Sequence, residues 1–316
     1  MVKSKSHSLI HFSWKTVIGL VLVGAFLYIV LPHIGELHTS VKLLEHVRAG
    51  WLASACLASL ATYLSAAGIY VVLAKHRLRY FPTLLVQGAS MFANRLLPGG
   101  VGALGVNFEY LRKNHHSVSE AVSVLAVDDL CGLVGHIMVL VTVLITVPFH
   151  LAPLSIPHTS TYVYWAGAAV IIVAAVVLVW SRKLRDELFR TILGVLKNIG
   201  RYRAHPLRLV WAIGISMSLT LLYSLCLAAC GHALNVHLAF GQFFLVMTVG
   251  VFAGTVTPTP GGLLGAEAGL LAGLVAYGVP AAPALAVVLA YRLLTYWLAF
   301  LLGAVAFFLS ERLRFL

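Results

Sequence analysis

The chain has 316 residues, of which 60% are hydrophobic and only 10% are charged. Soluble globular domains carry about 25% charged residues, so this chain has too few charges to cover a water-exposed surface. The composition therefore excludes a soluble enzyme and indicates an integral membrane protein. The net charge of +12 does not indicate a nucleic-acid partner, because the basic residues form short clusters at the ends of apolar runs.

Six apolar runs are long enough to cross a bilayer as helices, which takes about 20 residues. They cover residues 14–32, 50–74, 118–148, 161–180, 209–230 and 280–309. The first run resembles a signal peptide, but no small-residue cleavage site follows it, so we expect an uncleaved helix.

Two further apolar stretches, 80–113 and 239–277, are interrupted near the middle. The first contains Pro98-Gly99-Gly100 and the second contains Pro260-Gly261-Gly262. Proline cannot continue a helical hydrogen-bond ladder and consecutive glycines disfavour a helix, so the chain must turn at both places. We therefore predict two broken-helix hairpins, each of which leaves the membrane on the side where it entered.

The basic residues support these hairpins and orient the chain. If both hairpins are re-entrant and the N-terminus is inside, most of the 22 Lys and Arg residues lie on the inner side. If the first stretch crossed the membrane once, the basic cluster at 182–208 would lie outside, against the positive-inside rule. We expect a multi-pass protein of the cell (inner, cytoplasmic) membrane with both termini cytoplasmic.

The two Pro-Gly-Gly motifs are 162 residues apart, and each half of the chain reads helix, helix, broken hairpin, helix. The first membrane repeat, 1–148, and the second, 149–316, have opposite orientations in this layout. Inverted repeats with interrupted helices are typical of transporters, whose site lies where the repeats meet. We therefore predict an all-α polytopic membrane protein with six transmembrane helices and two re-entrant hairpins in an inverted repeat. Chance similarity between two glycine-rich stretches is the alternative.

The segment 181–208 is the only long hydrophilic stretch. Its apolar residues recur at helical spacing, which predicts a basic amphipathic helix on the inner leaflet that attracts anionic lipids. An ordinary positively charged loop is the alternative.

Six ionisable residues lie within the apolar stretches: Arg95, Glu109, Asp128, Asp129, Glu267 and Arg292. A charge in hydrocarbon costs roughly 2.5–3.5 kcal/mol unless it faces a partner or water, so these residues are functional candidates, with structural ion pairs as the alternative. For Arg292 we expect a partner in Glu267, Asp128, Asp129 or a lipid phosphate. Arg95 is expected to bind an anion, to cap a carbonyl or to pair with Glu109.

The breaks themselves suit an anion. A helix that starts after each Gly-Gly pair, near Val101 and near Leu263, directs free N–H groups and its positive dipole end at a phosphate. On another span, Asp129 and His136 are seven residues apart and share a helix face, a spacing compatible with a proton relay that includes Asp128. A histidine that only bonds a neighbour is the alternative. We find no motif for a metal ion, a cofactor or an enzyme active site.

The stretch TPTPGGLLGAEAGLLAGL, followed by a Gly-Val-Pro turn at 278–280 and AVVLAYRLLTYWL, resembles the lysylphosphatidylglycerol-synthase transmembrane-region family, also called flippase-like proteins. NRLLPGGVGALGVNFEYLRK resembles the matching N-terminal element, so the resemblance covers almost the whole chain. It implies a region that moves an aminoacylated phospholipid across the bilayer. The chain ends seven residues after Leu309, so we expect the soluble synthase domain of the best-known members to be absent.

The family pattern falls on Asn94, Pro98, Gly99, Gly100, Gly102, Pro258, Pro260, Gly261, Gly262, Glu267, Tyr291 and Arg292. The chain departs from it at Ala103, where many relatives have an acidic residue, and at Asp128-Asp129, where they often carry Glu-Arg.

These features predict a flippase-like protein that binds or translocates a phospholipid or a polyprenyl-phosphate lipid. The predicted substrate-binding residues are Asn94, Arg95, Pro98, Gly99, Gly100, Thr257, Pro260, Gly261, Gly262, Glu267, Tyr291 and Arg292. The alternatives are a secondary transporter of a small polar or anionic solute, and a lipid-headgroup transferase that uses Asp128, Asp129 and Glu267. Expected partners are anionic membrane lipids and a lipid synthase on another chain, for which the protein is then a scaffold.

Overall fold

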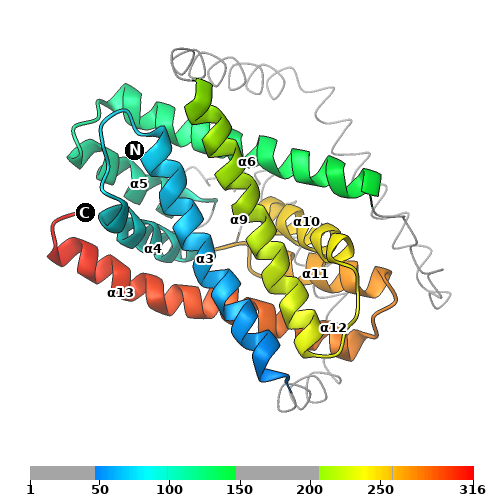
Figure 1. Ribbon diagram of the computed structural model, residues 1–316. Helices are drawn as coiled ribbons and strands as arrows, with labels where there is room; N and C mark the ends of the chain where they lie inside the picture. The colour runs from blue at the N-terminus through cyan, green and yellow to red at the C-terminus, as the bar shows by residue number, and fades with distance from the viewer. Residues whose placement is uncertain (1–46, 98, 147–205, 258) are drawn as a thin grey trace, which may run out of the picture.

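The computed structural model describes residues 47–97, 99–146, 206–257 and 259–316, and every regular element in these ranges is helical (Figure 1). Three single helices are long and apolar enough to cross a membrane: α3 (Ala49–Leu73), α6 (Val118–Thr146) and α9 (Pro206–Ala233). A fourth such span, Ala281–Arg312, consists of α12 (Ala281–Arg292), the π-helical segment η4 (Leu293–Leu298) and α13 (Ala299–Arg312).

These four helices agree with four of the six predicted spans to within three residues at each end. The other two predicted spans, 14–32 and 161–180, lie outside the described residues, as does the basic segment 181–208 up to residue 205; residues 206–208 belong to α9.

Each interrupted stretch forms two helices joined by a glycine turn. The first comprises α4 (Tyr80–Leu96) and α5 (Val101–Lys113), and the second comprises α10 (Phe240–Val256) and α11 (Gly265–Ala276). The arms are antiparallel and closely packed. A Cβ atom at Gly102 would lie 2.1 Å from the carbonyl oxygen of Ala93, and one at Gly269 would lie 2.8 Å from that of Val249. The predicted broken-helix hairpins are therefore present.

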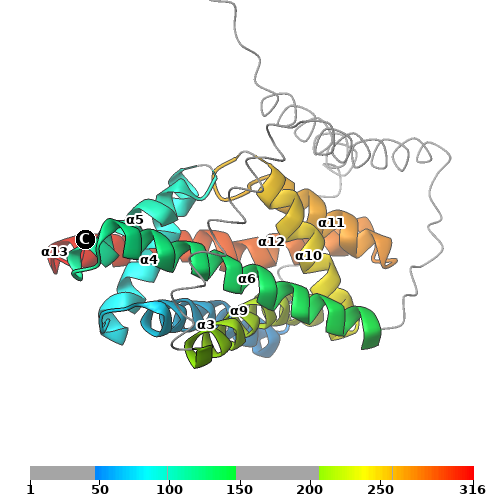
Figure 2. The same cartoon turned by 90° about the horizontal axis from the view of Figure 1, so that it is seen from above.

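Helices of the two halves of the chain pack against one another. α3 and α9 run antiparallel side by side, with the N–H of Arg48 donating to the carbonyl of Ala233 at one end (Figure 1). α4 packs along α13, and α10 crosses α6. The first arm of each hairpin therefore packs on the last long helix of the other half. Figure 2 shows α5, α10 and α11 on the same side of the α3–α9 pair, so both hairpins face one interior region.

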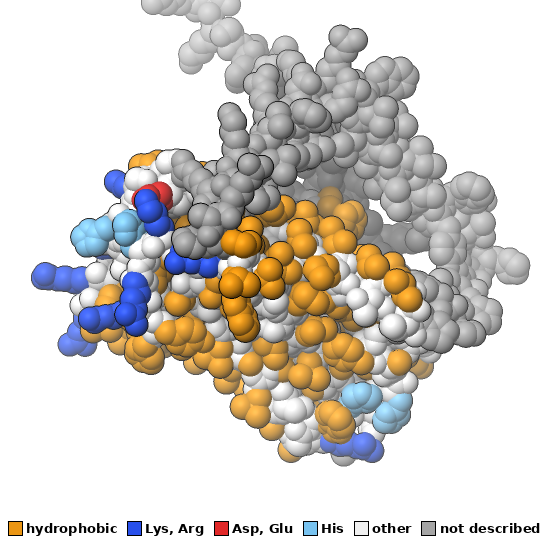
Figure 3. Space-filling view, turned by 45° about the horizontal axis from the view of Figure 1, so that its top comes forward, with side chains coloured by type: hydrophobic (Ala, Val, Ile, Leu, Met, Phe, Trp, Pro, Cys, Tyr) orange, Lys and Arg blue, Asp and Glu red, His pale blue; other side chains and the backbone are white. Residues whose placement is uncertain are grey.

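The described surface divides into an apolar middle and charged ends. Hydrophobic side chains cover the centre of the face in Figure 3, and Lys and Arg gather towards its ends. Large apolar side chains such as Ile145, Trp211 and Phe252 are between 67% and 80% exposed. An apolar surface of this extent fits a protein that is surrounded by lipid.

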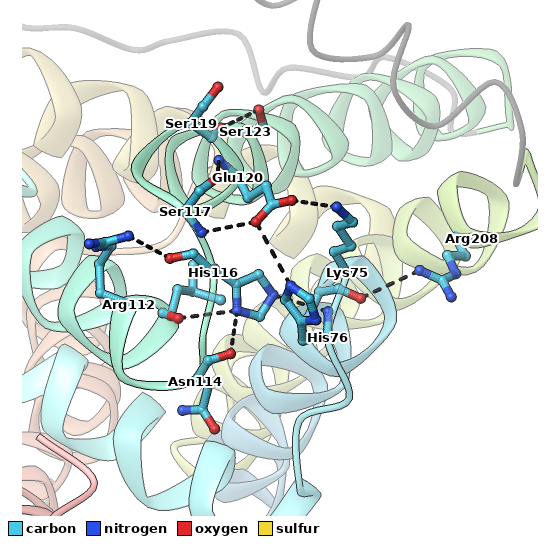
Figure 4. A network of polar contacts seen from close by, with 12 residues as sticks. Lys75, His76, Arg112, Asn114, His116, Ser117, Ser119, Glu120, Ser123 and Arg208 are labelled. Carbon is cyan, nitrogen blue, oxygen red and sulfur yellow. Dashed lines mark hydrogen bonds and ion pairs between the residues drawn. The ribbon is translucent and has the colours of Figure 1, made fainter.

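A polar network joins the loop before the first hairpin to the loop that follows it (Figure 4). The Lys75 ammonium lies 2.5 Å from Oε1 of Glu120, at the start of α6. The Arg208 guanidinium donates to the carbonyl of Ala74 at 3.4 Å and so joins the start of α9 to the same end. The first hairpin therefore returns to the end of the bundle from which it starts.

His116 lies at the centre of this network and is fully buried. Its Nε2 accepts a hydrogen bond of 3.3 Å from the backbone N–H of His76. Its Nδ1 lies 3.1 and 3.0 Å from the carbonyl oxygens of Leu111 and Asn114, so the ring is neutral with its proton on Nδ1. Burial lowers the pKa of His116 below its usual value.

Candidate functional site

A cavity of about 550 Å³ lies where the two hairpins meet. Its wall contains the glycine pair of each break, Gly99-Gly100 and Gly261-Gly262. Further predicted site residues in the wall are Asn94, Arg95, Thr257, Tyr291 and Arg292. The fold thus brings both breaks and both intramembrane arginines to one place.

The two breaks have related but unequal backbones. All four glycines have a positive φ between 61° and 78°, a conformation that glycine adopts without strain. α5 begins directly after Gly100, as predicted. The second arm begins at Gly265, two residues after the predicted position near Leu263, because Leu264 also has a positive φ of 72°. The Thr259 hydroxyl donates to the carbonyl of Leu263 at 2.6 Å and holds this longer turn.

Arg95 extends from the end of α4 towards the second half of the chain. Its guanidinium donates to the carbonyl oxygens of Met91 at 2.7 Å and of Thr295, 200 residues away, at 2.5 Å. Its Nε is buried without a partner. Carbonyl capping, one of the three predicted roles, is present in the structure, and anion binding stays a prediction. The alternative partner Glu109 is exposed on α5.

Arg292 pairs with Glu267, one of the partners predicted for it, and its Nε lies 2.5 Å from the Glu267 Oε1. The two side chains are only 13% and 21% exposed. Glu267 lies in the first turn of α11, where a carboxylate also compensates the helix dipole. The pair uses one atom of each group, which leaves Nη2 of Arg292 and Oε2 of Glu267 buried without partners.

Tyr296 joins the two arginines. The guanidinium carbons of Arg95 and Arg292 lie 5.3 and 4.9 Å from the centre of its ring. Both contacts are within the range of cation–π attraction. Two guanidinium groups and one carboxylate make this region of the cavity net positive. Tyr296 was not predicted as a site residue, although its position four residues after Arg292 places the two on the same helix face.

The other predicted binding residues differ in their burial and in their contacts. The Oδ1 of Asn94 is buried without a partner. The Thr257 hydroxyl donates to the carbonyl of Ala253 at 2.7 Å and so supports the end of α10. Pro260 is exposed at the turn, and Pro98 and Pro258 lie outside the described residues.

A second cavity, of about 350 Å³, adjoins the first. Tyr70, Asp128 and Asp129 line it. Asn94 and the Gly99-Gly100 pair line both cavities. The first break therefore forms a partition between a cationic and an acidic space.

His136 contacts α10 and lines neither cavity. Its Nε2 lies 3.2 Å from the Thr248 hydroxyl, and its ring packs against Phe244. The relay from Asp129 to His136 stays a prediction. Within the described ranges, no three His, Cys, Asp or Glu side chains are grouped as metal ligands.

Comparison with known proteins gives one family. Residues 16–303 match the family described as the lysylphosphatidylglycerol synthase TM region. The match includes both breaks and every cavity residue named above. No curated protein matches the chain.

Proposed function

The chain belongs to the lysylphosphatidylglycerol synthase TM-region family, and on this premise we propose that it binds a phosphate-bearing lipid and moves it across the bilayer. The headgroup phosphate lies in the 550 Å³ cavity between the guanidinium groups of Arg95 and Arg292. One observation carries the proposal: both arginines converge on the ring of Tyr296, beside the two glycine breaks, with buried N–H donors that have no partner.

Phosphate matches these donors in charge and in geometry. Guanidinium groups bind phosphate oxygens through short, charge-assisted hydrogen bonds. The glycines of the first break leave space for the ligand, since a Cβ atom at Gly99 would meet nothing within 4 Å and one at Gly100 only the Asn94 Oδ1, at 3.9 Å. The start of α5 adds the positive end of a helix dipole.

The cavity also suits a ligand whose tails remain in lipid. Val251 and Thr255 of α10 line the cavity and are exposed, and we propose that the cavity opens to lipid at this side. A water-soluble solute needs a cavity that is closed to lipid, so this side opening favours a lipid over a small polar solute.

We further propose that the protein moves the lipid without modifying it. A headgroup transferase needs paired acid and base groups that face a common cavity. Asp128 and Asp129 line the second cavity, whereas Glu267 pairs with Arg292 beside the first. The three carboxylates named for a transferase therefore do not face one common cavity.

The proposed membrane arrangement has six spans and two re-entrant hairpins in an inverted repeat, divided at residues 148 and 149. The antiparallel hairpins and the matching glycine pairs, 162 residues apart, support it. Rocking of one half against the other then exposes the shared cavity to each leaflet in turn. The basic residues Lys75, Arg77, Arg79, Arg112 and Lys113 flank the first hairpin at one end, which we propose is the cytoplasmic end.

Reconstitution tests the proposal. Wild-type protein, Arg95→Gln and Arg292→Gln are placed in vesicles, and movement of fluorescent phospholipid between leaflets is followed by bleaching of the outer leaflet. The control is Arg79→Gln, an identical change at an exposed residue whose backbone carbonyl accepts hydrogen bonds from Thr83. We expect at least tenfold slower translocation for both cavity variants and wild-type rates for the control. Wild-type rates in folded Arg95→Gln and Arg292→Gln contradict the proposal.

A further inference from the structure

Four buried polar atoms in and beside the arginine cavity have no hydrogen-bond partner. Two are donors, the Nε of Arg95 and the Nη2 of Arg292. Two are acceptors, the Oε2 of Glu267 and the Oδ1 of Asn94. Nearly all buried polar atoms in native proteins are paired with protein or ordered water, so four unpaired atoms at one site leave hydrogen bonds that a bound ligand can complete.

A phosphate group alone does not complete this set. Its oxygens accept hydrogen bonds and therefore satisfy the two arginine atoms. A dianionic phosphate offers no hydrogen for Glu267 or Asn94, and it repels the Glu267 carboxylate. A ligand that completes all four atoms must therefore also bring an N–H or O–H donor.

The Arg292–Glu267 pair sets how far apart the two ligand groups lie. A guanidinium and a carboxylate often form two parallel hydrogen bonds, but here only Nε and Oε1 are joined. The unpaired donor and the unpaired acceptor therefore belong to one ion pair. A ligand that meets both must carry its acceptor and its donor a short distance apart.

We propose that the headgroup is a phosphodiester with a primary ammonium or a hydroxyl group on the short arm next to the phosphate. This inference rests on the proposed function and narrows its substrate class. A trimethylammonium headgroup has the same charge as a primary ammonium but has no donor. A polyprenyl phosphate ends at the phosphate and has no such arm. Both are therefore poor ligands.

Phosphatidylethanolamine and phosphatidylcholine with identical acyl chains test the donor, because they differ only at the nitrogen, where three methyl groups replace three hydrogens. Purified full-length protein in an uncharged detergent is titrated with each lipid, and bound lipid is counted by native mass spectrometry. We expect phosphatidylethanolamine to bind about tenfold more tightly or better, the effect of one hydrogen bond to a charged group. Phosphatidylglycerol, titrated in parallel, shows whether a hydroxyl serves as well as an ammonium.

Two variants test whether Asn94 and Glu267 cause the preference for phosphatidylethanolamine. Asn94→Leu removes one acceptor at similar size, and Glu267→Gln removes the carboxylate. We expect each to bring the affinity ratio of the two lipids closer to one. Asn114→Leu is the matched control, because Asn114 follows α5 and its side chain bonds the Tyr110 carbonyl, away from the cavity. Melting temperatures identify variants that do not fold.

The outcomes separate this inference from the proposed function. If the lipids bind equally to wild-type protein but Arg95→Gln weakens both, the phosphate site stands and the donor inference is wrong. An unchanged preference in both folded acceptor variants also overturns the inference. If no lipid binds, or if Arg95→Gln has no effect on binding, the proposed function fails and the inference fails with it.

Discussion

Gly261, in the second break, packs closely against Tyr296, and substitution by alanine tests this contact. Its φ of 61° favours glycine, and an added Cβ atom would lie 2.6 Å from Cε2 of Tyr296 and 3.4 Å from Cγ of Arg95. Gly99 has a similar φ of 70°, but a Cβ atom there meets nothing within 4 Å. The two alanine variants therefore share the backbone strain and differ in the steric contact.

The expected magnitudes follow from this difference. Placing alanine in a left-handed conformation costs about 1–2 kcal/mol, and a smaller unfolded-state entropy offsets part of this. We expect Gly99→Ala to lower stability by about 1 kcal/mol. Gly261→Ala must also displace the buried ring of Tyr296, and overpacking of this kind costs about 1–3 kcal/mol more.

Reversible unfolding in mixed micelles, followed by circular dichroism, measures both variants. We expect Gly261→Ala to be the less stable by about 1–3 kcal/mol and to bind lipid more weakly, because Tyr296 positions the two arginines. Equal destabilisation by Gly99→Ala and Gly261→Ala would refute the packing of Tyr296 against the second break.

Three further predictions concern other contacts. We expect Glu267→Gln to destabilise the protein by about 2 kcal/mol, because Arg292 loses its partner. In a double-mutant cycle, Glu267→Gln/Arg292→Gln should recover part of this loss. Strictly additive effects of the two substitutions would contradict the pairing. Burial keeps His116 neutral and lowers its pKa, so the contribution of His116 to the free energy of unfolding is constant above about pH 6.5 and falls as the pH decreases below that value. The melting temperature against pH measures this, and His116→Gln should flatten the curve below pH 6.5; an unchanged slope contradicts it. We expect Gly102→Ala to disrupt the first hairpin, since its methyl group would overlap the Ala93 carbonyl, whereas Gly105→Ala on the same helix meets nothing within 4 Å and should preserve the melting temperature.

The sequence was sufficient for elements that depend on local chemistry. Apolar runs of spanning length predicted the four long helices, because a membrane requires such lengths. The Pro-Gly-Gly motifs predicted both breaks, since neither residue type sustains a helix. The pairing of Arg292 with Glu267 was one of a few possibilities, because a buried guanidinium requires an acceptor and few carboxylates lie within the membrane.

Features that depend on long-range packing did not follow from the sequence. Arg95 donates to the carbonyl of Thr295, 200 residues away, and no local pattern marks a backbone carbonyl as the partner. Leu264 adopts a left-handed conformation that side-chain-bearing residues seldom enter, so its extra turn was missed. Tyr296 is a site residue because the fold brings Arg95, at the end of α4, over its ring, and no local pattern indicates that contact.

Solid-state NMR offers the most direct test of a lipid phosphate held between Arg95 and Arg292. Protein with ¹⁵N-labelled arginine is reconstituted with a phosphodiester lipid, and dipolar coupling between the lipid phosphorus and the guanidinium nitrogens is recorded. We predict coupling that corresponds to direct hydrogen bonding in wild-type protein and that disappears in Arg95→Gln/Arg292→Gln. Coupling that is identical in wild-type and double-variant protein would come from arginines elsewhere and would contradict the account.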